Sequence, residues 1–172
     1  DTFREDVFSG LSKPDKSIPA KHLYDARGSE IFDEITEVQE YYPTRIERSI
    51  FETHHADIAA TLGPRATLIE PGAGSCEKAD MLLGWLNEPE AFVPIEISQT
   101  AVEPGAWMVA TNHPNVRVHP VCADFTAEPT ALPFARKRIV FFPGSTIGNL
   151  VKPQRLELLQ QFARYARPGG RL

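Results

Sequence analysis

The sequence predicts a doubly wound α/β fold on a parallel β-sheet, preceded by a helical segment. Short apolar runs alternate with segments of helical periodicity from about residue 64 onward. Strands separated by helices pair in parallel and have helices on both faces. The run 139–142 is apolar at every position, as expected for a strand covered on both sides. The length of 172 residues suits one domain of this kind.

Four strands and the start of a fifth follow from this alternation. We expect strands at 67–69, 92–97, 116–121 and 139–142, with Arg171-Leu172 beginning the fifth. Pro94 weakens the second strand because proline lacks a backbone donor. Helices are expected from Glu77 to Leu86, from Ser98 to Thr111, and after Pro153. The apolar face of the last helix is predicted to consist of Leu156, Leu159, Phe162 and Ala163.

The part before the sheet is predicted to be helical and irregular. An opening segment with prolines at 14 and 19 is expected to be extended. A short helix over residues 29–36 is expected to bury Ile31, Phe32 and Ile35. A longer helix is predicted to begin at a capping box of Thr44 and Glu47 and to end at Gly63-Pro64, because proline cannot continue a helix.

Composition and residue spacing disfavour several classes of function. The net charge of −5 and the pI near 5.5 disfavour a nucleic-acid or anionic-membrane partner, and no apolar run is long enough to span a bilayer. No metal site is expected, because the histidines and the two cysteines lack ligand spacing. Cys76 and Cys122 are expected to be free thiols in a cytoplasmic protein, and Cys76 is expected to pack rather than to act as a nucleophile.

Candidate ligand-binding residues follow each predicted strand. Glu70 to Gly74 form a glycine-rich turn after the first strand, where the backbone can approach a ligand. Glu96 closes the second strand and can accept from both ribose hydroxyls. Asp124 and Phe125 follow the third, and offer an acceptor for an exocyclic amine and an apolar surface for a base. The segment 144–149 follows the fourth. Together these residues predict a nucleoside site.

The kind of nucleoside ligand follows from what surrounds the glycines. A dinucleotide fingerprint needs a third small residue, where this sequence has Glu77, and an acid there suits a pyrophosphate poorly. NAD is therefore the poorer fit. Glu70 ahead of the glycines matches instead the acid-x-Gly-x-Gly pattern of S-adenosylmethionine enzymes, whose cofactor has no phosphate.

From about residue 20 onward the sequence resembles the histidine-specific, S-adenosylmethionine-dependent methyltransferases, whose best-known member methylates the α-amine of histidine in ergothioneine biosynthesis. The resemblance is carried by the blocks 23–36, 40–45, 70–78, 124–125 and 142–149. It implies a Rossmann-like fold of the class I methyltransferases. Within that fold, residues 1–63 would form an N-terminal helical segment that contributes to the substrate pocket, and residues 64–172 a cofactor-binding domain that is incomplete at its C-terminus.

The resemblance also implies roles for individual residues. The cofactor would contact Tyr24, Gly72, Gly74, Lys78, Glu96, Asp124 and Phe125. Catalysis and substrate orientation would involve Tyr24, Tyr41 and Asn149. The sequence departs from the family's usual pattern at Pro71, where leucine is common, and at Glu96, where aspartate is common.

The leading hypothesis is therefore N-methylation of the α-amine of histidine or a related amino acid, with S-adenosylmethionine as donor. Two alternatives stay open: a non-catalytic cofactor-binding fragment or regulatory module, and a methyltransferase for a different small amine. The expected partner is a small molecule. Self-association through an exposed sheet edge is also expected if the sheet lacks its remaining strands.

Overall fold

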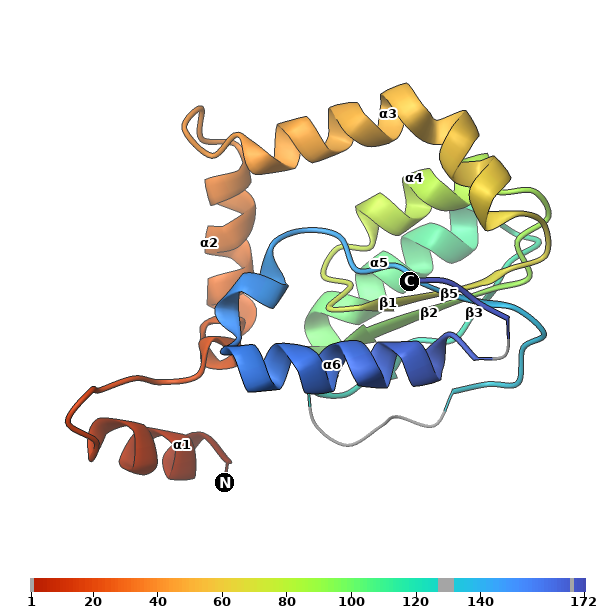
Figure 1. Ribbon diagram of the computed structural model, residues 1–172. Helices are drawn as coiled ribbons and strands as arrows, with labels where there is room; N and C mark the ends of the chain where they lie inside the picture. The colour runs from red at the N-terminus through yellow and green to blue at the C-terminus, as the bar shows by residue number, and fades with distance from the viewer. Residues whose placement is uncertain (1, 127–131, 168) are drawn as a thin grey trace.

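A parallel five-stranded sheet forms the centre of the molecule (Figure 1). The computed structural model describes residues 2–126, 132–167 and 169–172. The strands are β1 (Thr67–Pro71), β2 (Ala91–Glu96), β3 (Arg117–Val118), β4 (Val121–Cys122) and β5 (Arg138–Val140). They are ordered β3-β2-β1-β5, and β4 also pairs with β2. The predicted α/β class and parallel sheet are confirmed.

Helices cover both faces of this sheet. The helices α4 (Glu77–Trp85) and α5 (Gln99–Asn112) lie on one face, and α6 (Lys152–Tyr165) lies on the other (Figure 1). Successive residues of β1 accordingly enter different cores, because strand side chains alternate between faces. Leu68 belongs to the core beneath α4 and α5, and Ile69 to the core beneath α6. The sheet is therefore doubly wound.

The third predicted strand is divided into β3 and β4. Both pair with β2 in one continuous register, in which Phe92 lies opposite Val118 and Ile95 opposite Val121. The interruption thus falls beside Val93 and Pro94. The missing donor of Pro94 lies where the neighbouring strand is broken, so this buried proline is compatible with the middle of a sheet.

Four helical elements precede the sheet: α1 (Thr2–Leu11), η1 (Ala20–Leu23), α2 (Ala26–Thr36) and α3 (Pro43–Leu62). The expectation of an extended opening is wrong for residues 2–11, since the first proline comes only after α1 has ended. The predicted burial on α2 is also wrong. Ile31, Phe32 and Ile35 are 41%, 38% and 40% exposed, because α2 lies beside the sheet layers and not between them (Figure 1).

Two further predictions about helices are corrected by the structure. The capping box is wrong, because α3 begins at Pro43 without a side-chain cap and Glu47 makes other contacts. The inward face of α6 is formed by Leu158, Phe162 and Tyr165, spaced four and three residues apart, and Leu156 is 58% exposed. Phe162 was assigned correctly, whereas Leu156, Leu159 and Ala163 are not buried.

The strand order creates a switch point at β1. The chain leaves β1 for β2 on one side and returns to β5 on the other. Ligands of doubly wound sheets bind at such a point, beside the carboxyl ends of the strands. Beyond β5, Arg171 makes a single parallel bridge with Ile139, where the fifth strand was expected to begin. The residues that follow β1 and β5 therefore define where to look for a site.

Candidate functional site

The glycine turn after β1 is fastened to the end of β2. The backbone N–H groups of Gly72 and Ala73 both donate to the carbonyl of Ile95, at 2.7 and 3.2 Å. Gly72 has a φ of +70°, and a Cβ there would stand 3.1 Å from the ring of Phe125. Both the left-handed backbone and the close ring require glycine. The predicted turn residue and the predicted base-stacking residue are thus in contact.

Glu96 closes the other side of this turn. Its Oε2 accepts a 3.1 Å hydrogen bond from the N–H of Gly74, and its Oε1 accepts one of 2.8 Å from the N–H of Ile97. The carboxylate therefore joins the end of β2 to the glycine turn. Its oxygens keep acceptor capacity beyond these bonds, since an ionised carboxylate has about four lone-pair sites. Glycine turn and acid lie together as the sequence predicted.

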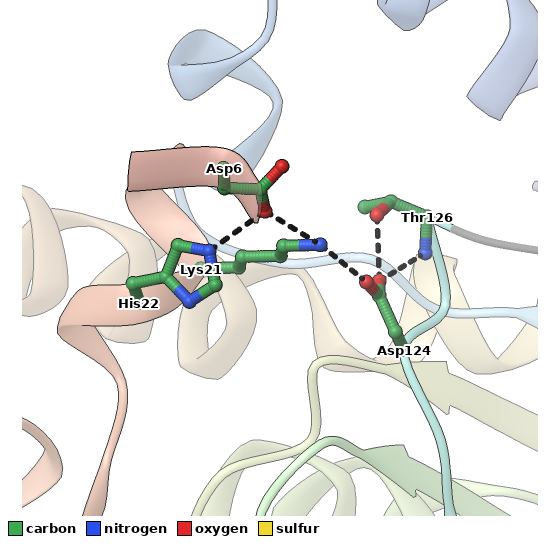
Figure 2. A network of polar contacts seen from close by, with 5 residues as sticks. All are labelled: Asp6, Lys21, His22, Asp124 and Thr126. Carbon is green, nitrogen blue, oxygen red and sulfur yellow. Dashed lines mark hydrogen bonds and ion pairs between the residues drawn. The ribbon is translucent and has the colours of Figure 1, made fainter. Parts of the chain in front are cut away.

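Asp124, two residues after β4, is held by a network of donors (Figure 2). Its Oδ1 accepts from the N–H and the hydroxyl of Thr126, at 2.9 and 2.6 Å. The Nζ of Lys21 lies 3.4 Å from Oδ2. Burial opposes ionisation, but the hydrogen bonds from Thr126 and the charge of Lys21 outweigh it and lower the pKa of Asp124. The residue is an ionised acceptor at neutral pH.

Phe125 rests on a set of aromatic rings. Its centroid lies 5.7 Å from that of Phe142 in an edge-to-face arrangement, and 6.4 Å from that of Phe162. Phe162 belongs to α6 and is fully buried. Such pairs add roughly 0.5–1.5 kcal/mol to the area they bury. The ring beside Gly72 is therefore backed by the core and presents a fixed apolar surface.

A second polar contact joins α3 to the loop after β5. Glu47 forms an ion pair with Lys78 through Oε2 and accepts a 2.6 Å hydrogen bond from the N–H of Gly144 through Oε1. Lys78 was predicted to bind the cofactor, but Glu47 was assigned to a helix cap. The misassigned residue thus connects three elements of the site. Only its contacts with Lys78 and Gly144 in the folded protein distinguish Glu47 from a helix-capping glutamate.

Glu70 lies at the base of the turn. It is 2% exposed, and its Oε2 has no hydrogen-bond partner. Burial raises the pKa of this carboxyl well above its ordinary value, against the opposing charge of Lys78. An orphaned buried oxygen is a polar atom that a donor on a ligand can satisfy.

Cys76 has the environment of a packing residue. It is 1% exposed, and burial raises the pKa of its thiol to about 12. A thiol that stays protonated is a poor nucleophile. Its place in the core agrees with the packing role that the sequence predicts for Cys76.

The three residues predicted for catalysis lie on separate elements. Tyr24 and Tyr41 are both partly buried, and each contacts Phe32, with ring centroids 6.2 and 6.3 Å apart respectively. Asn149 is exposed at the end of η2 (Thr146–Asn149). Within the described part of the chain, none of the three side chains hydrogen-bonds to the glycine turn. The structure thus brings the two tyrosines together through one ring, without joining them to Asn149.

The described residues form neither a membrane-spanning helix nor a cluster of metal ligands. None of the helices resolved in ranges 2–126, 132–167 and 169–172 is long and apolar enough to cross a membrane. Over the same ranges, no group of three or more His, Cys, Asp or Glu side chains is arranged to hold a metal ion.

The comparisons with known proteins identify the family of the chain. A model of the histidine-specific, S-adenosylmethionine-dependent methyltransferases matches residues 3–172. The chain belongs to this family. Histidine N-alpha-methyltransferase from Mycobacterium tuberculosis is 40% identical over 98% of the chain and 53% of that protein. The enzyme of the same name from Mycolicibacterium smegmatis is 38% identical over 100% of the chain and 54% of that protein.

The chain therefore spans about half the length of these relatives. A more distant relative, 4-dimethylallyltryptophan N-methyltransferase from Claviceps purpurea, is 26% identical over 99% of the chain and 52% of that protein. The relatives of this chain thus have names that specify different acceptors, histidine in one case and a tryptophan derivative in the other. Family membership by itself leaves the amine acceptor open.

Solved structures support the fold. Magnesium protoporphyrin IX methyltransferase from Synechocystis, with bound S-adenosylhomocysteine, has a TM-score of 0.61 at 10% identity, covering 86% of this chain and 66% of that one. The plantazolicin methyltransferase BpumL, also with S-adenosylhomocysteine, has a TM-score of 0.54 at 15% identity, covering 96% and 58%. The family member described here thus has the class I methyltransferase fold.

Proposed function

We propose that this protein transfers a methyl group from S-adenosylmethionine to the α-amine of histidine or a related amino acid. The observation that carries the proposal is the convergence at the switch point. Gly72 lies against Phe125, and Gly74 is bonded to Glu96, although these residues come from three different strand ends. A nucleoside needs this combination of an approachable backbone, a ring and a carboxylate.

The residues present fit the cofactor. Glu96 would accept from the ribose hydroxyls, and Asp124 from the exocyclic amine of adenine, with Phe125 beneath the base. Lys78 carries the positive charge that suits the carboxylate of the methionine moiety. Its side chain is 32% exposed and lies next to the loop that follows β5. The buried, unbonded oxygen of Glu70 fits the same polar end of the ligand.

The cofactor supplies a methyl group activated on a sulfonium. The protein's contribution is to hold an unprotonated amine in line with that methyl group and to exclude water. We assign orientation of the amine to the hydroxyls of Tyr24 and Tyr41, and anchoring of the amino-acid backbone to Asn149. Tyr24 would also touch the cofactor. Residues 1–63 would then supply much of the substrate pocket, and residues 64–172 the cofactor site.

Methyl-transfer assays on the full-length protein test this function. We expect labelled S-adenosylmethionine to label histidine in preference to other amino acids in a panel. Tryptophan derivatives belong in the panel, because the Claviceps relative is named for one. Labelling of another amine alone would establish the second candidate, a methyltransferase for a different substrate. Failure to label any amine would refute the enzymatic proposal.

Calorimetry on the 172-residue chain separates binding from turnover. Binding of S-adenosylhomocysteine without methyl transfer by the full-length protein would favour the alternative of a non-catalytic module. Binding of NAD in its place would contradict the assignment of the site. We further infer a cytoplasmic location, which the two free thiols support, since Cys122 is exposed and unpaired.

A further inference from the structure

The N-terminal segment reaches the predicted adenine end of the site through one lysine. The Nζ of Lys21, on η1, lies 3.4 Å from Oδ2 of Asp124 and 3.5 Å from Oδ2 of Asp6, on α1 (Figure 2). Asp6 in turn accepts from Nε2 of His22 at 2.8 Å. Lys21 is therefore shared between two carboxylates, one on each side, and is 32% exposed.

The contacts of Asp124 leave a defined acceptor position. An ionised carboxylate accepts at about four lone-pair sites, two on each oxygen. Two donors from Thr126 occupy Oδ1, whereas Lys21 is the one donor among the described residues that approaches Oδ2. One position on Oδ2 thus stays open while the other three hold the carboxylate in place. Lys21 does not need to leave for a further donor to bind.

The backbone of Lys21 also forms a hydrogen bond with Tyr24. Its carbonyl accepts a 3.3 Å hydrogen bond from the backbone N–H of Tyr24, which closes the turn of η1. Side chain and main chain of one residue therefore connect Asp124 with Tyr24. The two lie on parts of the chain about one hundred residues apart.

We propose that Lys21 is a positioning residue of the cofactor site. Its ammonium holds the Asp124 carboxylate with one lone pair of Oδ2 open to the exocyclic amine of adenine. The inference rests on the proposed function, because it takes Asp124 as the adenine acceptor. It adds a residue that acts through Asp124 and need not touch the cofactor.

The test compares two ligands on four forms of the full-length protein. The ligands are S-adenosylhomocysteine and its 6-deamino analogue, in which hydrogen replaces the exocyclic amine. The protein forms are the wild type, Lys21→Ala, Lys21→Arg and, as a control, Lys13→Ala. Lys13 is exposed, and its side chain makes no hydrogen bond or ion pair with the described part of the chain. Calorimetry gives the dissociation constant of each pair.

We expect the wild type to prefer the amine-bearing ligand by about tenfold or more, the range for a hydrogen bond to a charged group. Lys21→Ala should reduce this preference by about two- to fivefold, the usual effect of a partly exposed ion pair. Lys21→Arg should recover part of it, and Lys13→Ala should retain all of it. The ratio of the two constants is informative, because general loosening of the segment would weaken both ligands equally.

Two results would overturn the inference and leave the proposed function standing. One is a wild-type preference that Lys21→Ala does not change. The other is an equal loss of affinity for both ligands in Lys21→Ala, which would mean that the lysine only stabilises the segment. A wild type that binds neither ligand would instead refute the proposed function itself.

Discussion

The segment before residue 64 and the sheet domain after it are held together by different forces. The strand β1 buries all five of its residues, whereas α3 extends over twenty residues without burying one. Ile46 and Ile50 on α3 are 53% and 51% exposed. In the sheet domain, Phe92 and Phe162 are fully buried. Apolar burial therefore stabilises the second region much more than the first.

The N-terminal segment is instead oriented by charged contacts that end on the site. Lys21 reaches Asp124, and Glu47 reaches both Lys78 and Gly144. Some apolar packing accompanies these contacts further along α3, at Ile58 and Leu62. Partly exposed ion pairs contribute little to stability but define geometry. We therefore expect substitutions in the sheet region to change the stability of the fold. Substitutions at the charged contacts should instead change the affinity for ligands.

The largest expected effect compares one buried and one exposed apolar residue. Phe162→Ala should reduce the free energy of unfolding by about 3–5 kcal/mol, because it removes a fully buried ring and leaves a cavity. Ile50→Ala, on α3, should reduce it by less than about 1 kcal/mol. Urea denaturation of both variants measures the difference. Equal losses would refute the contrast between the two regions.

Next in size is the close approach of Gly72 to Phe125. Gly72→Ala should weaken binding of S-adenosylhomocysteine by about tenfold or more, because the methyl group would displace the ring at 3.1 Å or open the turn. Gly169→Ala is the matched control. Gly169 also has a positive φ, of +68°, but an added Cβ there would meet nothing within 4 Å. Titration calorimetry should show altered binding in the first variant only, and equal binding in both would contradict the assigned turn.

Glu70 makes the stability of the ligand-free protein depend on pH. Burial keeps its carboxyl neutral in the folded state, whereas the unfolded chain ionises it above the ordinary pKa of 4.5. Folding must then take up a proton, so the free energy of unfolding falls as the pH rises above that value. Glu70→Gln should remove this dependence, because an amide does not titrate in this range. Denaturation of the wild type and of Glu70→Gln at pH 5 and pH 8 measures this dependence. An equal change in the free energy of unfolding between the two pH values in both proteins would contradict the prediction.

The smallest expected effect concerns the contact between α3 and the site. Glu47→Gln should weaken S-adenosylhomocysteine binding by about two- to fivefold, because Lys78 loses its partner and the loop at Gly144 loses part of its anchor. Glu52→Gln, at an exposed position of the same helix, should leave the affinity for S-adenosylhomocysteine unchanged. The loss should shrink as salt is added, since the charges are partly exposed. If Glu47→Gln reduced the free energy of unfolding by more than the free energy of ligand binding, Glu47 would be mainly a structural residue.

The sheet could be predicted because its signal is local. Alternating apolar runs and helical patterns gave β1, β2 and β5 to within two residues, and the acids and glycines at the strand ends followed from that order. The division of the third strand was not visible, because it depends on how Pro94 lies against the neighbouring chain. The inward face of α6 was misjudged for a similar reason. Its alanine and leucines repeat at several helical spacings, and only contact with the sheet selects Leu158 and Tyr165.

By itself the sequence determined the parallel α/β class, the glycine turn, and the order in which Glu96, Asp124 and Phe125 follow the strands. These features depend on residue type and periodicity along the chain. Only the tertiary structure decided that Glu47 pairs with Lys78 and that Lys21 holds Asp124. Such contacts join residues 31 and 103 positions apart. No local pattern selects the partner of an exposed charge, because many are available and each pair is weak. Burial of the sheet brings these particular charges together.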